Sequence, residues 1–308
     1  MKPTDFIVLV VLAALWGGSF LFMRIASPAI GPLLLADVRV LIAGGALLVY
    51  AATFGQVPPF RARWKGYFVM GALNAALPFS LISAAELHLT AGLAAILNAT
   101  TPLFAAIVSA VWLNEELTVR KMVGVLLGLA GVGVLVGWGP LELEPLVVLS
   151  AGASLLAAVL YAFAGVYARI NFIGEPPLAL SIWQQMAAGI LLFPMALPAT
   201  AIAHPNLYLT VEVGVSVIAL ALLSTSLAFL LYFRLIARVG PTKTLSATFL
   251  VPVFAVLWGV LLLRETVHAG TLLGMGTILL AVFLVTEVRQ RGAHYVKHQS
   301  NANHSSIT

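Results

Sequence analysis

Ten apolar runs, separated by short polar connections, constrain the fold of this chain more than any other feature of its sequence. Each run is about 17–23 residues long, the length at which an α-helix crosses a hydrocarbon core of roughly 30 Å. The sequence therefore predicts an all-α integral membrane protein with ten transmembrane helices. The runs cover residues 6–25, 33–53, 66–86, 92–113, 122–138, 147–168, 178–198, 211–233, 244–263 and 269–288.

The amino-acid composition excludes a water-soluble fold. Of the 308 residues, 61% are hydrophobic and only 9% are charged, whereas soluble domains carry roughly a quarter charged residues. The first run continues into Arg24 without a small-residue cleavage site, so we expect a retained helix and not a removed signal peptide. The chain contains no cysteine, which excludes a disulfide framework and a thiolate metal site.

The distribution of lysine and arginine predicts the orientation of the chain. If the N-terminus is cytoplasmic, the inner connections hold nearly all basic residues outside the runs, and the outer connections hold only Arg264. We therefore expect a multi-pass protein of the bacterial inner (cytoplasmic) membrane with both termini in the cytoplasm. Because the basic residues form no single patch, we expect no nucleic-acid partner.

The two halves of the chain repeat each other. At a shift of 145 residues Arg24 falls on Arg169 and Arg39 on Gln184, and at a shift of 150 residues the stretch 102–115 falls on 252–265. Each half holds five runs, and an odd number makes the second copy enter the membrane from the opposite side. The sequence thus predicts two inverted five-helix repeats around a central cavity. We assign residues 1–140 to the first repeat, 141–290 to the second and 291–308 to a disordered cytoplasmic tail.

Three features of the sequence are characteristic: residues 12–19, Arg39 followed by small and apolar residues, and the stretch from Pro102 through residues 114–118 to Gly128. They resemble motifs of the EamA family of the drug/metabolite transporter superfamily. The resemblance covers essentially the whole chain and is greatest to YddG-type amino-acid exporters. It implies a ten-helix basket whose central cavity is formed mainly by helices 1, 3, 4, 6, 8 and 9, with helices 5 and 10 at the periphery.

Three prolines inside the runs are candidate gating residues. A proline removes the hydrogen-bond donor of the carbonyl four residues earlier, and in a membrane such a carbonyl needs other protein groups or a water-filled cavity. Either these prolines only bend helices for packing, or they mark a cavity and its hinges, and the repeat symmetry favours the second interpretation. The prolines are Pro78, Pro102 and Pro252, and the freed carbonyls belong to Asn74, Asn98 and Thr248.

Uncharged polar and aromatic residues inside the runs predict the substrate site. A polar cavity with aromatic walls suits a zwitterion or an amphipathic neutral molecule better than a multiply charged one. For any single residue the alternative is that a hydroxyl bonds its own helix or that an aromatic ring marks the membrane interface. The predicted substrate-binding residues are Trp16, Asn74, Phe79, Asn98, Thr101, Tyr161, Trp183, Ser224, Ser246 and Thr248.

Two carboxyl groups are candidates for proton coupling, because ionisable groups are costly inside a membrane and are commonly functional there. They are Glu86 and Asp37. In the alternative, structural interpretation, Glu86 lies close to water at the outer end of its helix and Asp37 pairs with Arg24 or Arg39. Gly124 with Gly128 and Gly270 with Gly274 have the spacing of close helix contacts, within one chain or between chains, so the sequence leaves the oligomeric state open.

The sequence contains no phosphate-binding loop, no helical histidine pair with an intervening glutamate and no nucleophile elbow, so we predict no enzyme, no cofactor and no metal site. The leading hypothesis is a lipid-embedded secondary transporter that exports neutral, apolar or aromatic amino acids and related amphipathic metabolites by alternating access. A nucleotide-sugar or sugar-phosphate carrier is the first alternative and would use Lys243 and Arg39 to bind phosphate. A non-transporting structural or receptor membrane protein is the second.

Overall fold

The computed structural model describes residues 1–137, 144–203 and 209–286, and all regular secondary structure in these ranges is helical. Eight segments are long and apolar enough to cross a membrane, and α7 (Val119–Gly137) and the 17-residue α13 (Ala247–Leu263) complete the ten predicted helices. Uninterrupted helices are α1 (Pro3–Ile30), α2 (Pro32–Thr53), α8 (Pro145–Asn171), α9 (Pro177–Ala203) and α14 (Ala269–Thr286).

The remaining three segments are interrupted within the membrane-spanning length. Two of them contain a π-helical turn at matching places, and the third is broken after Asn98. Short helices η1 (Arg61–Arg63) and α12 (Pro241–Thr244) precede the third and the ninth segment. The interrupted segments are α3 (Trp64–Gly71), η2 (Ala72–Ala76) and α4 (Leu77–Ala85); α5 (Ala91–Asn98) and α6 (Thr101–Trp112); and α10 (Val211–Ala221), η3 (Leu222–Leu227) and α11 (Ala228–Val239).

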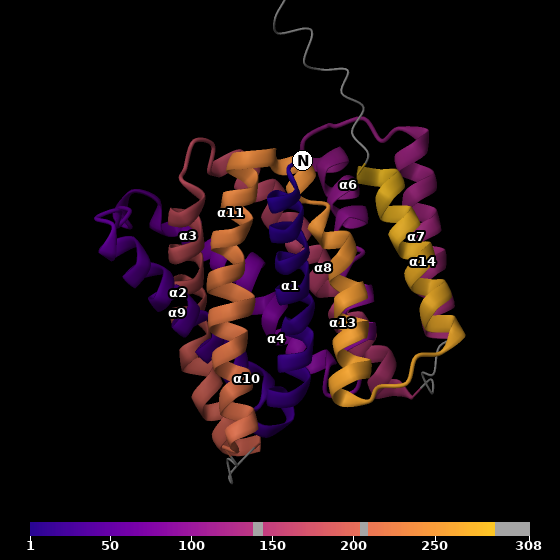
Figure 1. Cartoon of the computed structure of the whole chain (residues 1–308), viewed down its shortest axis with the longest axis horizontal. Coiled ribbons are helices and arrows are strands. Elements are labelled where there is room, and N and C mark those ends of the chain that lie inside the picture. The colour runs from indigo at the N-terminus through magenta and orange to yellow at the C-terminus, as the bar shows by residue number, and fades with distance from the viewer. Residues whose placement is uncertain (138–143, 204–208, 287–308) are drawn as a thin grey trace, which may run out of the picture.

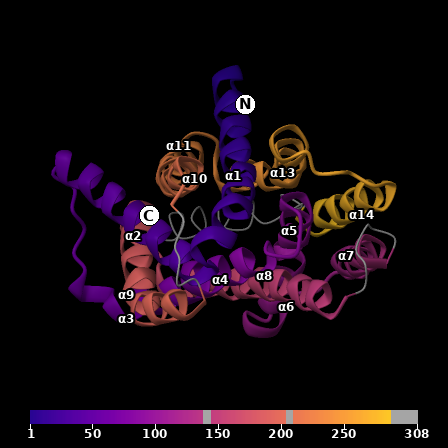
Figure 2. The ribbon, with the colours of Figure 1, turned by 90° about the horizontal axis from the view of Figure 1, so that it is seen from below.

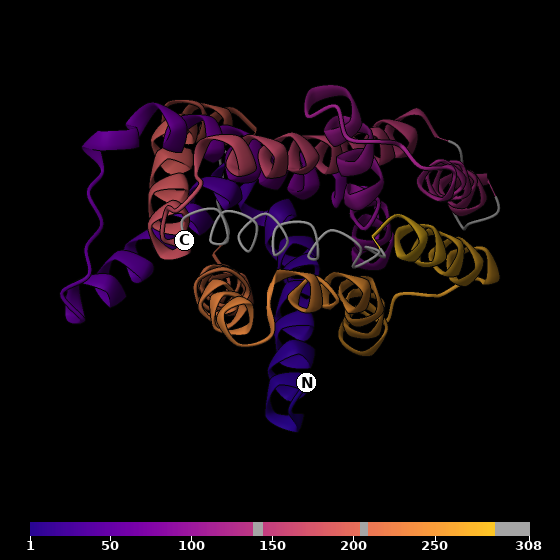
Figure 3. The same ribbon diagram turned by 90° about the horizontal axis from the view of Figure 1, so that it is seen from above.

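The helices of the two halves pack in matching arrangements (Figures 1 and 2). α1 packs between α10–α11 and α13, and its counterpart α8 packs in the same way between α4 and α6. α2 packs on its own counterpart α9, and α7 packs on α14, so that these two pairs form opposite edges of the molecule (Figure 3). An inverted repeat produces this pattern. The predicted boundaries at 140 and 290 and the predicted tail 291–308 lie outside the described residues.

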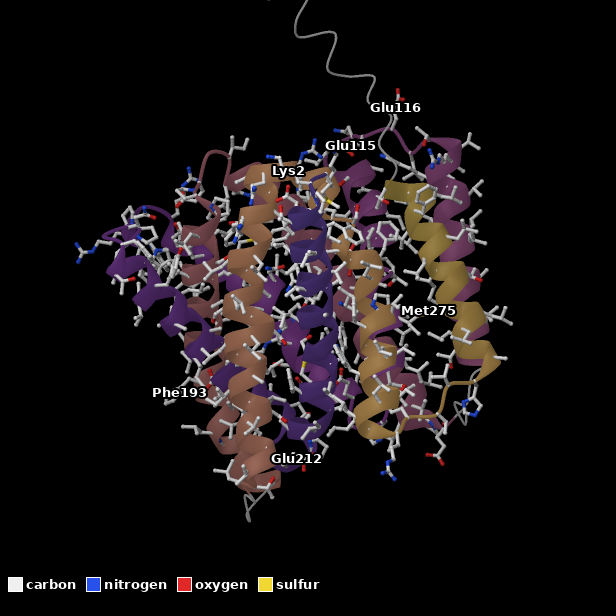
Figure 4. All side chains as sticks on the ribbon, viewed as in Figure 1. Lys2, Glu115, Glu116, Phe193, Glu212 and Met275 are labelled. Carbon is white, nitrogen blue, oxygen red and sulfur yellow. The ribbon has the colours of Figure 1, made fainter. Side chains whose placement is uncertain are left out.

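Charged residues mark the two ends of the helix bundle. Lys2, Glu115 and Glu116 lie at one end, and Glu212 lies at the other (Figure 4). Lys2 precedes the first segment and Glu115 follows the fourth, so an even number of crossings separates them, as their shared end requires. Between the ends, large apolar side chains face outward, for example Phe193 on α9, which is 53% exposed. Such a surface matches surrounding lipid.

The glycine pairs form a contact within the chain. A Cβ atom on Gly124 would lie 2.6 Å from Val285 Cγ2, and one on Gly274 would lie 2.9 Å from Leu135 Cβ. Only glycine allows the backbones of α7 and α14 to approach this closely. The contact therefore joins the last helix of each half.

Candidate substrate site

The two π-helical turns form polar junctions between the halves. In η2, Asn74 Nδ2 donates to Gln184 Oε1 of α9 at 3.0 Å; in η3, Thr225 Oγ1 accepts from Arg39 Nε of α2, also at 3.0 Å. Arg39 and Gln184 occupy matching positions of the sequence repeat. π-helical turns are common at functional sites because they disturb the regular hydrogen-bond ladder. Each junction thus joins the third segment of one half to the second helix of the other.

Hydroxyl groups satisfy the backbone that the π-turn in η3 leaves open. Thr225 Oγ1 donates to the carbonyl of Leu220 at 2.9 Å, and Ser226 Oγ lies 3.1 Å from the carbonyl of Ala221. Ser226 Oγ also approaches the carbonyl of Ala43 on α2 at 3.2 Å. Serine and threonine at these positions therefore allow an irregular turn to be buried at membrane depth.

Arg39 is a buried cation on α2. Its side chain is only 4% exposed, and its guanidinium carbon lies 3.7 Å from the centroid of the Phe79 ring. Nη1 faces the sulfur of Met23 at 3.5 Å. Among the described residues no carboxylate lies within 4.0 Å of the guanidinium, so the alternative in which it pairs with Asp37 is wrong. The ring of Phe79 stabilises the charge by a cation–π contact but does not neutralise it.

The end of α4 carries a second buried polar group. Glu86 is fully buried, and both of its carboxylate oxygens lack a hydrogen-bond partner in the described part of the chain, as does Ser83 Oγ. The side chain is thus shielded from water, although Leu87 and His88, which follow it at the end of the helix, are exposed. Arg24 on α1 explains the burial, because its Nη1 donates to the backbone carbonyl of Glu86 and holds α1 over this end of α4.

The structure brings together only some of the predicted substrate residues. Phe79 and Tyr161 pack in one cluster with α2 and α9. Trp16 instead packs on Tyr232 with ring centroids 5.5 Å apart, and Trp183 donates from Nε1 to the carbonyl of Pro58 at 3.1 Å. The two tryptophans consequently belong to other clusters than Phe79.

The polar members of the predicted set differ in burial. Asn98 Oδ1 and Ser224 Oγ are buried without a hydrogen-bond partner among the described residues, whereas Ser246 is exposed. The hydroxyls of Thr101 and Thr248 each donate at 2.7 Å to a carbonyl three residues earlier, which is the local role that the alternative interpretation assigns to them. Asn98 and Ser224 thus have the most capacity to bind a ligand.

The three candidate gating prolines lie in different local structures. Pro102 is near the start of α6, directly after the break that follows Asn98, and Pro78 is near the start of α4, directly after η2. Pro252 lies inside α13, whereas the break in that segment comes earlier, at residues 245 and 246. The matched prolines therefore do not mark matched breaks, and their gating role stays a prediction.

Sequence reasoning missed one pair of side-chain atoms. Both amide atoms of Gln185 are buried without a hydrogen-bond partner in the described part of the chain, and so is Oδ1 of Asp37. Two consecutive glutamines inside an apolar run were the available signal.

Two hollows, one beside Glu265 and one between α6 and α7, contain none of the predicted substrate residues. No group of three potential metal ligands occurs within the described ranges.

Comparisons with known proteins place this architecture in a family. The profile of the EamA-like transporter family matches the chain twice, over residues 5–137 and 148–287. The uncharacterized inner membrane transporter YedA of Escherichia coli K12 is 32% identical over 90% of this chain and 89% of its own length. The uncharacterized transporter YoaV of Bacillus subtilis is 24% identical over 90% and 95%, and protein PecM of Dickeya dadantii is 26% identical over 94% and 93%.

A solved structure shares the fold. It superposes with a TM-score of 0.63 at 20% sequence identity and covers 93% of this chain and 97% of its own. At this identity the likeness concerns the fold alone. The double match of the family profile, together with the similarity to YedA, shows that this multi-pass membrane protein belongs to the EamA-like transporter family of the drug/metabolite transporter superfamily.

Proposed function

We propose that this protein exports, or facilitates the passage of, neutral amino acids with apolar or aromatic side chains and related amphipathic metabolites. The observation that carries the proposal is the buried group around Arg39, Phe79 and Tyr161, where the two halves meet and polar atoms lack partners among the described residues. Rocking of the two halves about this group would open it to each side in turn. The resemblance to YddG-type exporters supports the amino-acid cargo.

The scarcity of charge favours a zwitterion. Removing a charge from water costs several kcal/mol unless the site replaces the lost hydration. In an amino acid the carboxylate and the ammonium are close together, so part of their field cancels, and amide, hydroxyl and backbone groups can satisfy the rest. The aromatic rings of Phe79 and Tyr161 would stabilise an apolar or aromatic side chain.

A phosphate-bearing cargo fits the site less well. Two phosphates need several cations within reach, but Lys243 is exposed, and Arg39 is the single buried cation of the two candidates. We therefore expect nucleotide sugars and sugar phosphates to be transported more slowly than neutral amino acids.

Uptake by liposomes tests the proposal. Purified protein should take up labelled phenylalanine and leucine faster than aspartate, glutamate, lysine or a nucleotide sugar. Asn98→Ala should weaken uptake of all good substrates together, because Asn98 Oδ1 is free to bind a ligand. Asn171→Ala is the matched control, since Asn171 is exposed and donates to the carbonyl of Tyr167. Preferential uptake of a phosphorylated or dianionic compound would overturn the assignment.

The same liposomes test the driving force. We propose that Glu86 or Asp37 carries a coupling proton, because both have buried carboxyl oxygens without a partner in the described part of the chain. A pH gradient should then drive accumulation, and Glu86→Gln or Asp37→Asn should abolish that dependence. Equal uptake with and without the gradient would identify a facilitator.

The orientation is a further part of the proposal. We expect the connection 56–65 and the segment after residue 287 to be cytoplasmic and 141–145 to be external, although 141–143 and the segment after 287 lie outside the described residues. Because the chain has no cysteine, single cysteines at these places can be probed with an impermeant thiol reagent. Labelling of position 62 from outside intact cells would contradict the orientation.

A further inference from the structure

One face of α4 carries an aromatic ring, a hydroxyl and a carboxyl in sequence. Phe79, Ser83 and Glu86 are separated by four and three residues, the spacing that places side chains on the same side of a helix. Arg39 from α2 lies over the ring of Phe79. A cation therefore stands at one end of this face and a carboxyl about two helical turns away at the other.

Within the described ranges, both ends of the face lack an ion-pair partner of opposite charge. Arg39 donates to Thr225 and faces the sulfur of Met23, neither of which is anionic. The two oxygens of Glu86 and the hydroxyl oxygen of Ser83, on side chains no more than 1% exposed, make no hydrogen bond within the described ranges. Arg39 and Glu86 form no ion pair with each other within 4.0 Å. Buried charges without partners are costly, so such an arrangement indicates a missing third component.

Two arginines and two carboxyls lie along this face in the described part of the chain. Arg39 lies over Phe79, Arg24 Nη1 donates to the backbone carbonyl of Glu86, and Glu265 binds Ala91, five residues after Glu86. Glu265 is already engaged, because its Oε1 accepts from the backbone N–H of Ala91 at 2.9 Å. An added anion or cation would disturb this balance, whereas a molecule with one charge of each sign and no net charge would preserve it.

We propose that this face of α4 binds the main-chain zwitterion of an α-amino acid, with its carboxylate on Arg39 and its ammonium on Glu86. The inference rests on the proposed function, since it specifies how an amino-acid cargo is recognised. The planar guanidinium matches a carboxylate, and the ammonium supplies the donors that the Glu86 oxygens lack. Ser83 Oγ adds a hydrogen bond between the two charged ends. Selectivity for amino acids thus comes from the main chain, and the side chain of the cargo is left to the aromatic walls.

Three compounds that share a phenyl ring test the carboxylate contact and the ammonium contact separately. They are L-phenylalanine, L-phenylalaninamide, which lacks the carboxylate, and 3-phenylpropionate, which lacks the ammonium. Each analogue should compete with labelled phenylalanine in liposome counterflow at least about tenfold more weakly than phenylalanine itself, the ratio expected when a hydrogen bond to a charged group is lost. Arg39→Gln should erase the preference over the amide, and Glu86→Gln the preference over phenylpropionate.

The controls use the same substitutions far from the face. Arg63→Gln and Glu115→Gln each alter a residue whose ion pair includes an exposed arginine, and both should keep the preference of the unmodified protein. Arg39→Lys keeps the charge and should retain part of the preference for the acid over the amide, which remains measurable if Arg39→Gln folds poorly. Unchanged ratios in Arg39→Gln and Glu86→Gln would overturn the inference.

A binding measurement separates this inference from the proposed function. Thermal unfolding of the purified protein in detergent should shift upward more with phenylalanine than with either analogue at equal concentration. If no amino acid is transported but this order is observed, the proposed function fails and the site stands. If amino acids are transported and all three compounds shift the midpoint equally, the site fails and the function stands.

Discussion

The junctions at η2 and η3 join matching segments of the two halves but differ in chemistry. In one, two neutral amides meet, Asn74 and Gln184; in the other, the guanidinium of Arg39 bonds the hydroxyl of Thr225. Both are built by a π-turn and by the second helix of the opposite half. The helices are therefore duplicated, but the polar groups at the two junctions are not. A symmetric frame can hold an asymmetric ligand because single positions differ, and Arg39 against Gln184 is the principal difference.

We expect the largest effect when the η2 junction is also given a charge. Gln184→Arg would place a second guanidinium beside Asn74, where the side chain of Gln184 is 2% exposed. A buried charge without a partner destabilises a protein by about 3–5 kcal/mol, so the unfolding midpoint in detergent should fall steeply. Gln184→Met is the matched neutral control and should cost about 1 kcal/mol. Equal midpoints for the two variants would show that η2 tolerates charge as η3 does.

Substitution of the two matched prolines should affect the transport rate to different extents. Pro102→Ala should slow turnover several-fold by changing the balance of inward and outward states by about 1 kcal/mol, since Pro102 starts α6 after a break. Pro252→Ala should slow it less, because Pro252 lies inside α13 and the break at 245–246 remains. Both variants should express normally. Initial rates in liposomes, normalised to protein amount, check this, and unmodified rates in both would make the prolines packing devices.

The matched glutamates should give the smallest effect. Glu265 accepts from the N–H of Ala91 at the start of α5, so Glu265→Gln should cost about 1 kcal/mol of stability. Glu115 pairs at 2.5 Å with Arg169, whose side chain is 65% exposed, so Glu115→Gln should cost about 0.5 kcal/mol or less. The unfolding midpoints of the two variants measure the difference. A larger loss for Glu115→Gln would reverse the expected order.

Sequence alone predicted the features that depend on many residues. The ten crossings follow from long apolar runs, and the family follows from motifs that recur in both halves. A disturbance of the fourth segment was also predictable, because Pro102 has no N–H to donate to the carbonyl of Asn98. That carbonyl instead accepts a hydrogen bond from the hydroxyl of Thr101 at 2.7 Å.

Features that depend on one neighbour from a distant part of the chain could not be read from the sequence. Glu86 looked accessible because it ends a helix, but Arg24 holds α1 over it. The sequence predicted that Trp183 lines the substrate site, but its indole N–H donates to the carbonyl of Pro58. The π-turn of η3 carries no proline or glycine, so no local signal distinguished it from a regular helix.

The π-turn in η2 determines which side chains of α4 face Arg39. A single residue more than a regular helix requires rotates the rest of the segment by about 100°. Deleting one residue of η2, such as Ala75, would therefore turn Phe79, Ser83 and Glu86 away from Arg39 without changing any of those side chains. An insertion of one residue, and not a substitution, is enough to change which side chains of a membrane helix face Arg39. Relatives of this chain can accordingly gain or lose a site by a change in length that no comparison of residue types would reveal.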